Sequence, residues 1–114
     1  MIVLVCGGRR YSDRHKVYRV LDSMRDHIDW VVHGGATGAD SFADDWAHER
    51  GKFVAKFPIY GETWNQYGYP AGPIRNEAMF KMRPDLVIAF PGGKGTANAI
   101  RLAERYKVGV REVE

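Results

Sequence analysis

Cysteine, long apolar runs and runs of one charge sign are all scarce in this sequence. Its 114 residues include a single cysteine, Cys6, which excludes an internal disulfide framework and a cysteine-rich zinc site. No stretch is long and apolar enough to span a bilayer, and the opening run "MIVLVC" is too short for a signal peptide. We therefore expect a soluble, cytoplasmic protein that has no membrane partner.

The charged residues are dispersed rather than clustered. Lysine and arginine number 17, aspartate and glutamate number 14, and the formal net charge is +3. The lack of a basic tail or stripe argues against nucleic acid as the main partner, whereas a mild positive charge suits an anionic small molecule. The four histidines are scattered and show no His-x-x-x-His spacing, so we expect neither a bound metal nor a cofactor.

Short apolar runs alternate with segments of helical periodicity along the chain. The apolar runs predict buried strands at residues 2–6, 30–33, 53–57, 85–90 and 108–113. Helical patterns lie between them, at residues 17–28, at 42–47, from near Pro73 onward, and at 96–106. Apolar strands that alternate with helices predict a mostly parallel sheet covered on both faces. We therefore expect one Rossmann-like α/β domain over residues 1–114, with about five strands and helices on both faces.

Three of the expected strands end in glycine-rich turns, "CGGRR" (6–10), "HGGATGAD" (33–40) and "FPGGKGT" (90–96). The carboxyl ends of parallel strands lie at one edge of a sheet, where open α/β sheets bind their ligands. Glycines let the backbone approach a ligand, and successive N–H groups at the start of the next helix attract an anion. We therefore predict a phosphate site at this edge, formed by Gly92, Gly93, Gly95 and Thr96.

Two common nucleotide motifs are missing. The P-loop pattern GxxxxGK[ST] is absent because Lys94 precedes Gly95. The dinucleotide pattern GxGxxG does not follow the first strand, and His33 stands where a ribose-binding acid would follow the second. A P-loop NTPase and an NAD-dependent dehydrogenase are therefore disfavoured.

Arg9 and Arg75 are predicted to contact the phosphate, because each lies next to this edge and a guanidinium binds phosphate in a bidentate fork.

Taken together, these motifs resemble the SLOG superfamily of Rossmann-like proteins. The motifs "GGR" (7–9), "HGGATGAD" (33–40), Trp64, "AGPIRN" (71–76) and "FPGGKGT" (90–96) occur in the order typical of its branch related to YspA and YpsA. The resemblance covers nearly the whole chain, and the joint set is specific although each piece alone is not. The superfamily also includes the cytokinin-activating nucleoside-monophosphate phosphoribohydrolases and the DNA-processing protein DprA.

The resemblance implies a nucleotide or nucleotide-derived ligand, with its phosphate on the turn at 90–96 and its ribose and base nearer the turn at 33–40. It also implies a sensor or binding protein of bacterial or phage conflict and regulation, and a homo-oligomer, dimer or higher. The residues expected to contact the ligand are Gly7, Gly8, Arg9, Gly34, Gly35, Asp40, Trp64, Arg75, Asn76, Pro91, Gly92, Gly93, Lys94, Gly95 and Thr96.

One departure from the family pattern bears on catalysis. The phosphoribohydrolases carry PGGxGTxxE, and this glutamate acts with an arginine of RKxxM on the N-glycosidic bond. Arg75 and Met79 match the second motif, but Ala99 replaces the glutamate. Alanine can neither stabilise oxocarbenium-like charge nor activate water, so we favour a binding protein. The first alternative is a hydrolase or transferase acting on the N-glycosidic or phosphoribosyl bond of a nucleoside monophosphate, with Arg75 and Asp40 as catalytic residues.

The second alternative is a module that binds single-stranded DNA, in the manner of DprA, or a protein partner. Aromatic residues at Trp64, Tyr67 and Tyr69 fit several uses, since they can stack on a base, pin their own loop or fill a subunit interface. His33, at the end of the second strand, is interpreted as a hydrogen-bonded structural histidine. Cys6 is interpreted as a small buried apolar residue.

Overall fold

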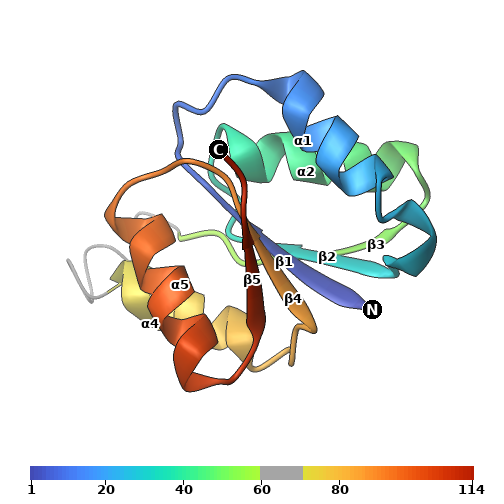
Figure 1. Cartoon of the computed structure of the whole chain (residues 1–114). Helices are drawn as coiled ribbons and strands as arrows, with labels where there is room; N and C mark the ends of the chain where they lie inside the picture. The colour runs from blue at the N-terminus through green and yellow to red at the C-terminus, as the bar shows by residue number, and fades with distance from the viewer. Residues whose placement is uncertain (60–70) are drawn as a thin grey trace.

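The computed structural model describes residues 1–59 and 71–114, which form one five-stranded sheet with helices on both faces (Figure 1). The strands are β1 (Ile2–Cys6), β2 (Trp30–His33), β3 (Phe53–Lys56), β4 (Leu86–Ala89) and β5 (Gly109–Glu112). They run parallel, in the order β3-β2-β1-β4-β5. The predicted α/β class with a parallel sheet is confirmed, although β3, β4 and β5 are each shorter than the apolar run that predicted them.

The helices of the described segments are α1 (Arg14–Asp22), α2 (Ala39–Glu49), α4 (Ala71–Phe80) and α5 (Lys94–Arg105), with a short 3-10 helix, η1 (Arg25–His27). Helix α1 is shorter than the periodicity predicted, because it ends at Asp22 rather than near Ile28. The Ser23 hydroxyl donates a hydrogen bond to the Val20 carbonyl oxygen (2.5 Å), and such a local bond competes with continuation of the helix. Ile28 reaches the core through η1 instead.

Two helices begin earlier than the sequence predicted. Helix α4 begins at Ala71, so Pro73 is its third residue rather than its first. The N–H groups of the first turn have no acceptor within the helix, and proline is therefore tolerated there. Helix α5 begins at Lys94 rather than at residue 96, so Lys94 and Gly95 belong to its first turn.

Each face of the sheet has its own apolar cluster. Val3 and Val5 of β1 pack with α1 and α2, and Leu4 and Cys6 pack with α4 and α5, because successive side chains of a strand point to opposite faces. Figure 1 shows α1 and α2 on one side of the sheet and α4 and α5 on the other. Cys6 is 8% exposed within the second cluster, as the interpretation of a small buried residue predicts, and this burial raises the pKa of its thiol to about 12.

The strand order determines where a ligand fits. The chain runs outward from β1 to β2 and β3 on one half of the sheet, and then returns to the other half for β4 and β5. The carboxyl ends of β1 and β4 are therefore the topological switch point, where open α/β sheets leave a crevice. In the described segments, no helix has the length and apolar character needed to cross a membrane.

Candidate functional site

The turns after β1, β2 and β4 pack against one another at the carboxyl edge of the sheet. The N–H of Gly8 donates to the carbonyl oxygen of Pro91 (2.9 Å), which joins the β1 turn to the β4 turn. The Thr37 hydroxyl donates to the carbonyl oxygen of Arg9 (3.0 Å), which joins the β2 turn to the β1 turn. The three turns that the sequence placed at one edge therefore meet.

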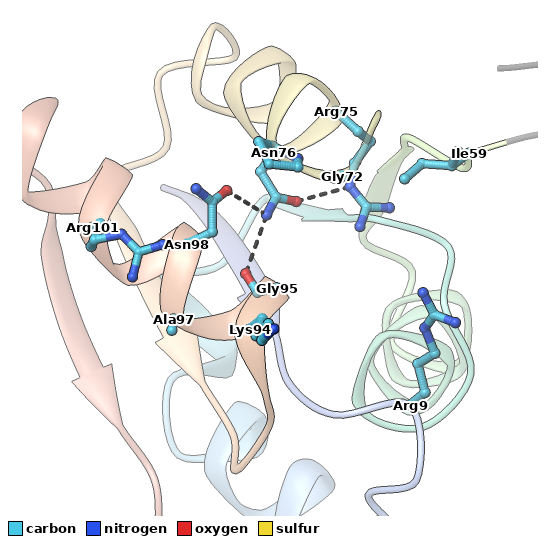
Figure 2. A pocket seen from close by; sticks show the side chains of 11 residues that line it. Arg9, Ile59, Gly72, Arg75, Asn76, Lys94, Gly95, Ala97, Asn98 and Arg101 are labelled. Atoms are coloured by element: carbon cyan, nitrogen blue, oxygen red, sulfur yellow. Dashed lines mark hydrogen bonds between the residues drawn. The ribbon is translucent and has the colours of Figure 1, made fainter. Parts of the chain in front are cut away.

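Two adjoining cavities open beside these turns. The inner cavity, of about 360 Å³, lies between the β1 turn, the start of α2, α4 and the first turn of α5. The outer cavity, of about 340 Å³, is lined by residues of α4 and α5 (Figure 2). Both cavities are lined by Arg9, Arg75, Asn76, Lys94 and Gly95, so they adjoin, and the two together are called the cleft.

Arg75 of α4 lines both cavities and is held by the protein. Its Nη1 donates to the carbonyl oxygens of Gly34 (2.6 Å) and Phe57 (3.2 Å). Partial burial lowers the pKa of Arg75; the Asp40 carboxylate raises this pKa and the Arg9 guanidinium lowers it. A guanidinium stays charged under such shifts, so Arg75 presents a fixed cation to the cleft.

Asn76 positions Arg75 and the first turn of α5. Its side chain is almost completely buried, and its Oδ1 accepts a hydrogen bond from Arg75 Nε (2.9 Å). Its Nδ2 donates to the Gly95 carbonyl oxygen (3.2 Å) and to Asn98 Oδ1 (3.0 Å), as the dashed lines in Figure 2 show. Asn76 therefore links α4 to α5, a role that the sequence pattern did not indicate.

Asp40, in the first turn of α2, is the one carboxylate among the described residues that line the cleft. It is 6% exposed, and its Oδ2 accepts hydrogen bonds from the N–H groups of Gly34 (3.0 Å) and Ala36 (3.3 Å). Burial raises the pKa of Asp40, whereas the two N–H groups and the Arg75 guanidinium lower it. The side chain therefore closes the β2 turn and faces the inner cavity.

The glycines of the turns fall into two groups. A Cβ on Gly7 would lie 2.6 Å from Ala39 Cβ, and a Cβ on Gly92 would lie 2.2 Å from Thr96 Oγ1, so the packing of the turns requires glycine at both positions. Gly93 and Gly95 differ, because among the described residues no heavy atom outside the adjoining backbone lies within 4 Å of a Cβ built at either position. Both line the inner cavity, so their missing side chains leave open space at the N-terminus of α5.

Residues 1–59 match the family model described as the YspA, cpYpsA-related SLOG family, which is more than half of the chain. The chain belongs to this SLOG family. It is also similar to the Gene 61 protein of Mycobacterium phage D29, with 33% identity over 117 residues that cover 95% of this chain and 90% of that protein. The family that the motifs resembled is therefore confirmed.

Two solved structures share the fold of this SLOG protein. The structure of TM1055 has a TM-score of 0.72 and 20% identity, and the match covers 96% of this chain and 72% of that one. The Moco carrier protein from Chlamydomonas reinhardtii has a TM-score of 0.68 and 17% identity, over 98% of this chain and 75% of that one. At these identities the likeness concerns the fold, and it agrees with the Rossmann-like architecture.

The SLOG motifs contribute most of the residues that line the cleft. Of the ligand contacts predicted from the sequence, those that line one or both cavities are Gly7, Gly8, Arg9, Asp40, Arg75, Asn76, Gly93, Lys94, Gly95 and Thr96. Gly34 lies against the Arg75 guanidinium, and Gly35 lies beside Lys56 and Pro58. Pro91 and Gly92 are exposed in the β4 turn without lining either cavity. Trp64 lies outside the described residues.

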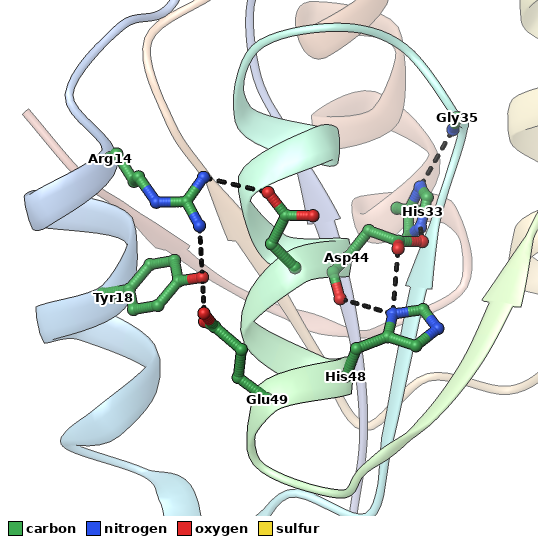
Figure 3. A network of polar contacts seen from close by, with 8 residues as sticks. Arg14, Tyr18, His33, Gly35, Asp44, His48 and Glu49 are labelled. Atoms are coloured by element: carbon green, nitrogen blue, oxygen red, sulfur yellow. Dashed lines mark hydrogen bonds and ion pairs between the residues drawn. The ribbon is translucent and has the colours of Figure 1, made fainter.

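His33 of this SLOG protein is a structural residue, as the sequence indicated. Its Nδ1 accepts the N–H of Gly35 (2.9 Å), so the proton of the neutral ring is on Nε2, which donates to Asp44 Oδ2 (2.5 Å). The other oxygen of Asp44 pairs with His48 Nδ1 (3.0 Å), one turn further along α2 (Figure 3). The network ties the β2 turn to α2 and contributes no residue to the cleft.

Sequence reasoning missed one wall of the outer cavity. Asn98 and Arg101 of α5 line it, as do Gly72 and Pro73 at the start of α4. A signal was present, because residues four and seven positions after Lys94 lie on the same face of a helix. Among residues 1–59 and 71–114, no three or more His, Cys, Asp or Glu side chains are grouped to hold a metal ion.

Proposed function

We propose that this protein binds a nucleotide or nucleotide-derived ligand that contains a phosphoribosyl group, at the carboxyl edge of its sheet. The observation that supports this most is the inner cavity, where two glycines with no internal packing constraint, Gly93 and Gly95, adjoin Arg9 and Arg75. The phosphate lies at the first turn of α5, where N–H groups lack helical partners and the helix dipole favours an anion.

In this proposal Arg75 contacts the phosphate at little entropic cost. Its hydrogen bonds to Gly34, Phe57 and Asn76 already hold the side chain in one conformation. A group that is fixed before binding loses less conformational freedom on contact with a ligand. Arg9 is exposed at the mouth of the cleft and adds a second guanidinium. The ribose lies toward Asp40, whose carboxylate has further acceptor capacity beyond its two backbone hydrogen bonds.

A binding or sensing role is favoured over turnover. Ala99, at the position of the phosphoribohydrolase glutamate, is buried in the apolar cluster beneath α4 and α5. The similarity to a protein of Mycobacterium phage D29 supports a role in phage or bacterial regulation. The name of the Moco carrier protein describes a carrier, which gives a precedent for ligand binding on this fold.

One observation favours a hydrolase as the second candidate. Asp40 lines the inner cavity beside Arg75, and burial raises the pKa of its carboxyl group. A carboxyl group with a raised pKa is suited to general acid–base catalysis near neutral pH. In this alternative the substrate is a nucleoside monophosphate, and Asp40 performs the task of the absent glutamate.

Thermal unfolding in the presence of AMP, a cyclic nucleotide, NAD and ADP-ribose tests the binding proposal. We expect at least one compound to raise the Tm, because a ligand at 100 times its Kd adds about 2.7 kcal/mol of stability. Arg9→Gln is expected to reduce the shift without changing the Tm of the free protein. Arg10→Gln is the matched control, because Arg10 is exposed next to Arg9 and lines neither cavity.

The outcomes separate the candidates. Absence of any shift, together with absence of a copurifying nucleotide by mass spectrometry, would reject nucleotide binding. An equal loss of the ligand-induced Tm shift in the Arg9→Gln and Arg10→Gln variants would reject the site. Release of free base from a nucleoside monophosphate, abolished by Asp40→Asn, would establish the hydrolase, and no release from any monophosphate would eliminate it.

A further inference from the structure

The outer cavity has a chemical character of its own. Its walls come from the first two turns of α5, from the start of α4 and from the β1 turn. The cations that line it are Arg9, Arg75, Lys94 and Arg101, and no acidic residue lines it in the described part of the chain. The inner cavity, by contrast, contains Asp40. Among the described residues, the outer cavity of about 340 Å³ is therefore bordered by positive charge alone.

Among the described residues, two arginines form ion pairs with acidic side chains. Arg14 pairs with Asp45 (2.9 Å), and Arg50 pairs with Asp22 (3.0 Å). Among residues 1–59 and 71–114, none of the four cations of the outer cavity takes part in an ion pair. Cations that line one cavity repel one another, and a bound anion relieves this repulsion.

The four cations do not gather at one point. Figure 2 shows Arg9 and Arg75 on one side of the cavity, Arg101 on the other, and Lys94 between them. Arg101 extends from α5 next to Asn98, whose orientation is set by its hydrogen bond with Asn76. A single phosphate at the first turn of α5 contacts the Arg75 side of the cleft but leaves the Arg101 side without an anion.

We propose that the outer cavity binds a second phosphate of the same ligand, so that the protein recognises nucleotides with two phosphate groups in preference to monophosphates. Arg101 and Lys94 contact this second phosphate, and Asn98 adds an amide beside it. The inference rests on the proposed function, because the first phosphate lies in the inner cavity. It adds a ligand class and a specificity residue, Arg101, which lies outside the glycine-rich motifs.

Titration calorimetry with AMP, ADP, ADP-ribose and adenosine 3′,5′-bisphosphate tests the inference. We expect at least one two-phosphate compound to bind about tenfold more tightly than AMP, since one charge-assisted hydrogen bond contributes at least that factor. Arg101→Gln is expected to remove this preference and to leave the affinity for AMP unchanged. Arg105→Gln removes the same charge from the same helix outside the cavity and is the matched control.

The results distinguish this inference from the proposed function. Binding of AMP as tight as binding of every two-phosphate compound would overturn the second phosphate site and leave the first intact. An Arg101 variant that loses affinity for AMP and for the two-phosphate compounds equally would overturn the role of Arg101 in selectivity. Failure of all four compounds to bind the wild-type protein would overturn this inference, whereas the proposed function is rejected by the thermal-shift panel together with mass spectrometry. Comparing ADP with the 3′,5′-bisphosphate shows whether the two phosphates are adjacent or separate.

Discussion

At the scale of single residues, identical amino acids in the glycine-rich turns have different physical reasons to be there. Gly7 and Gly92 are required because neighbouring atoms leave no room for a Cβ. Gly93 and Gly95 meet no such limit, although they lie in the same short segment as Gly92. Substitutions at these two groups should therefore affect different properties, stability in the first and ligand binding in the second.

Gly95→Ala is expected to weaken phosphate binding without weakening the fold. Alanine in a helix is favoured over glycine by roughly 0.5–1 kcal/mol, so the variant should unfold at the wild-type temperature or above it. Its methyl group would enter the space at the N-terminus of α5 that the phosphate needs. Thermal unfolding with and without ligand measures both effects. The control is Gly109→Ala, since a Cβ there would make only ordinary contact with Leu86, at 3.9 Å. Undiminished binding by Gly95→Ala would contradict the phosphate position.

Asp40 should make the protein less stable as pH rises above the normal aspartate range. Its folded-state pKa lies above the unfolded value of 3.8, so the folded state binds more protons between these two values. Stability contributed by the protonated group is present at low pH and is lost as pH rises through this window. Asp40→Asn should remove the loss, because one carbonyl oxygen can accept both hydrogen bonds that Oδ2 now accepts. Urea unfolding between pH 3.5 and pH 7 gives the difference between the two proteins. If the difference in unfolding free energy between the two proteins does not change with pH, Asp40 has a normal pKa.

At the scale of secondary-structure elements, the cleft depends on how α4 is held against α5. Asn76 makes three hydrogen bonds, to Arg75, to Asn98 and to the Gly95 carbonyl oxygen, and each partner lines the outer cavity. One buried side chain therefore fixes the position of the first turn of α5 relative to Arg75. Helix α4 thus supplies a cation and also the residue that positions it.

Asn76→Ala is expected to destabilise the protein more than Asn98→Ala does. The first change removes all three hydrogen bonds of a buried hub, and leaving a buried polar group without a partner costs about 1–3 kcal/mol. Asn98→Ala removes only one of these three hydrogen bonds, the one that Asn98 Oδ1 accepts from Asn76. Urea unfolding gives the two free energies, and ligand titration should show a loss of affinity for Asn76→Ala. Equal destabilisation by the two substitutions would show that Asn76 does not link the helices.

At the scale of the whole molecule, the sheet order brings together segments that are far apart in the chain. The turns at 6–10 and 90–96 become neighbours because β1 and β4 are adjacent. The residues that the family model matches, 1–59, supply Arg9 and Asp40, whereas Arg75, Lys94 and Arg101 come from the second half of the chain. The cleft is therefore complete only when both halves of the sheet have formed.

The homo-oligomer expected from the sequence stays a prediction, and sedimentation equilibrium tests it. We expect a mass of at least twice the 12.9 kDa of one chain. Phe53, on the edge strand β3, is 64% exposed, and Ile74 of α4 is 47% exposed. Phe53→Ser and Ile74→Ser then show which face is involved, because polar substitution in an apolar interface favours the monomer. A wild-type protein that sediments as a monomer would contradict the expectation.

Much of the fold was predictable from the sequence because its signals are local. The apolar run at 2–6 and the glycines that follow it indicate a buried strand and a turn without reference to distant residues. Element ends were less predictable. Ser23 is the C-cap of α1 and its hydroxyl bonds to the Val20 carbonyl oxygen, while α4 accepts Pro73 as its third residue. Neither detail follows from periodicity.

The sequence alone determined the alternation of strands and helices, the glycine-rich turns at one edge, and the SLOG family, since apolar periodicity and motif order are properties of the chain itself. The tertiary structure alone decided which glycines leave open space, that Asn76 is a buried link between helices, and that Arg101 joins Arg9 and Arg75 around one cavity. The reason is physical. Burial, hydrogen-bond partners and converging charge depend on pairs of atoms that sequence order keeps far apart and that only packing brings within a few ångströms.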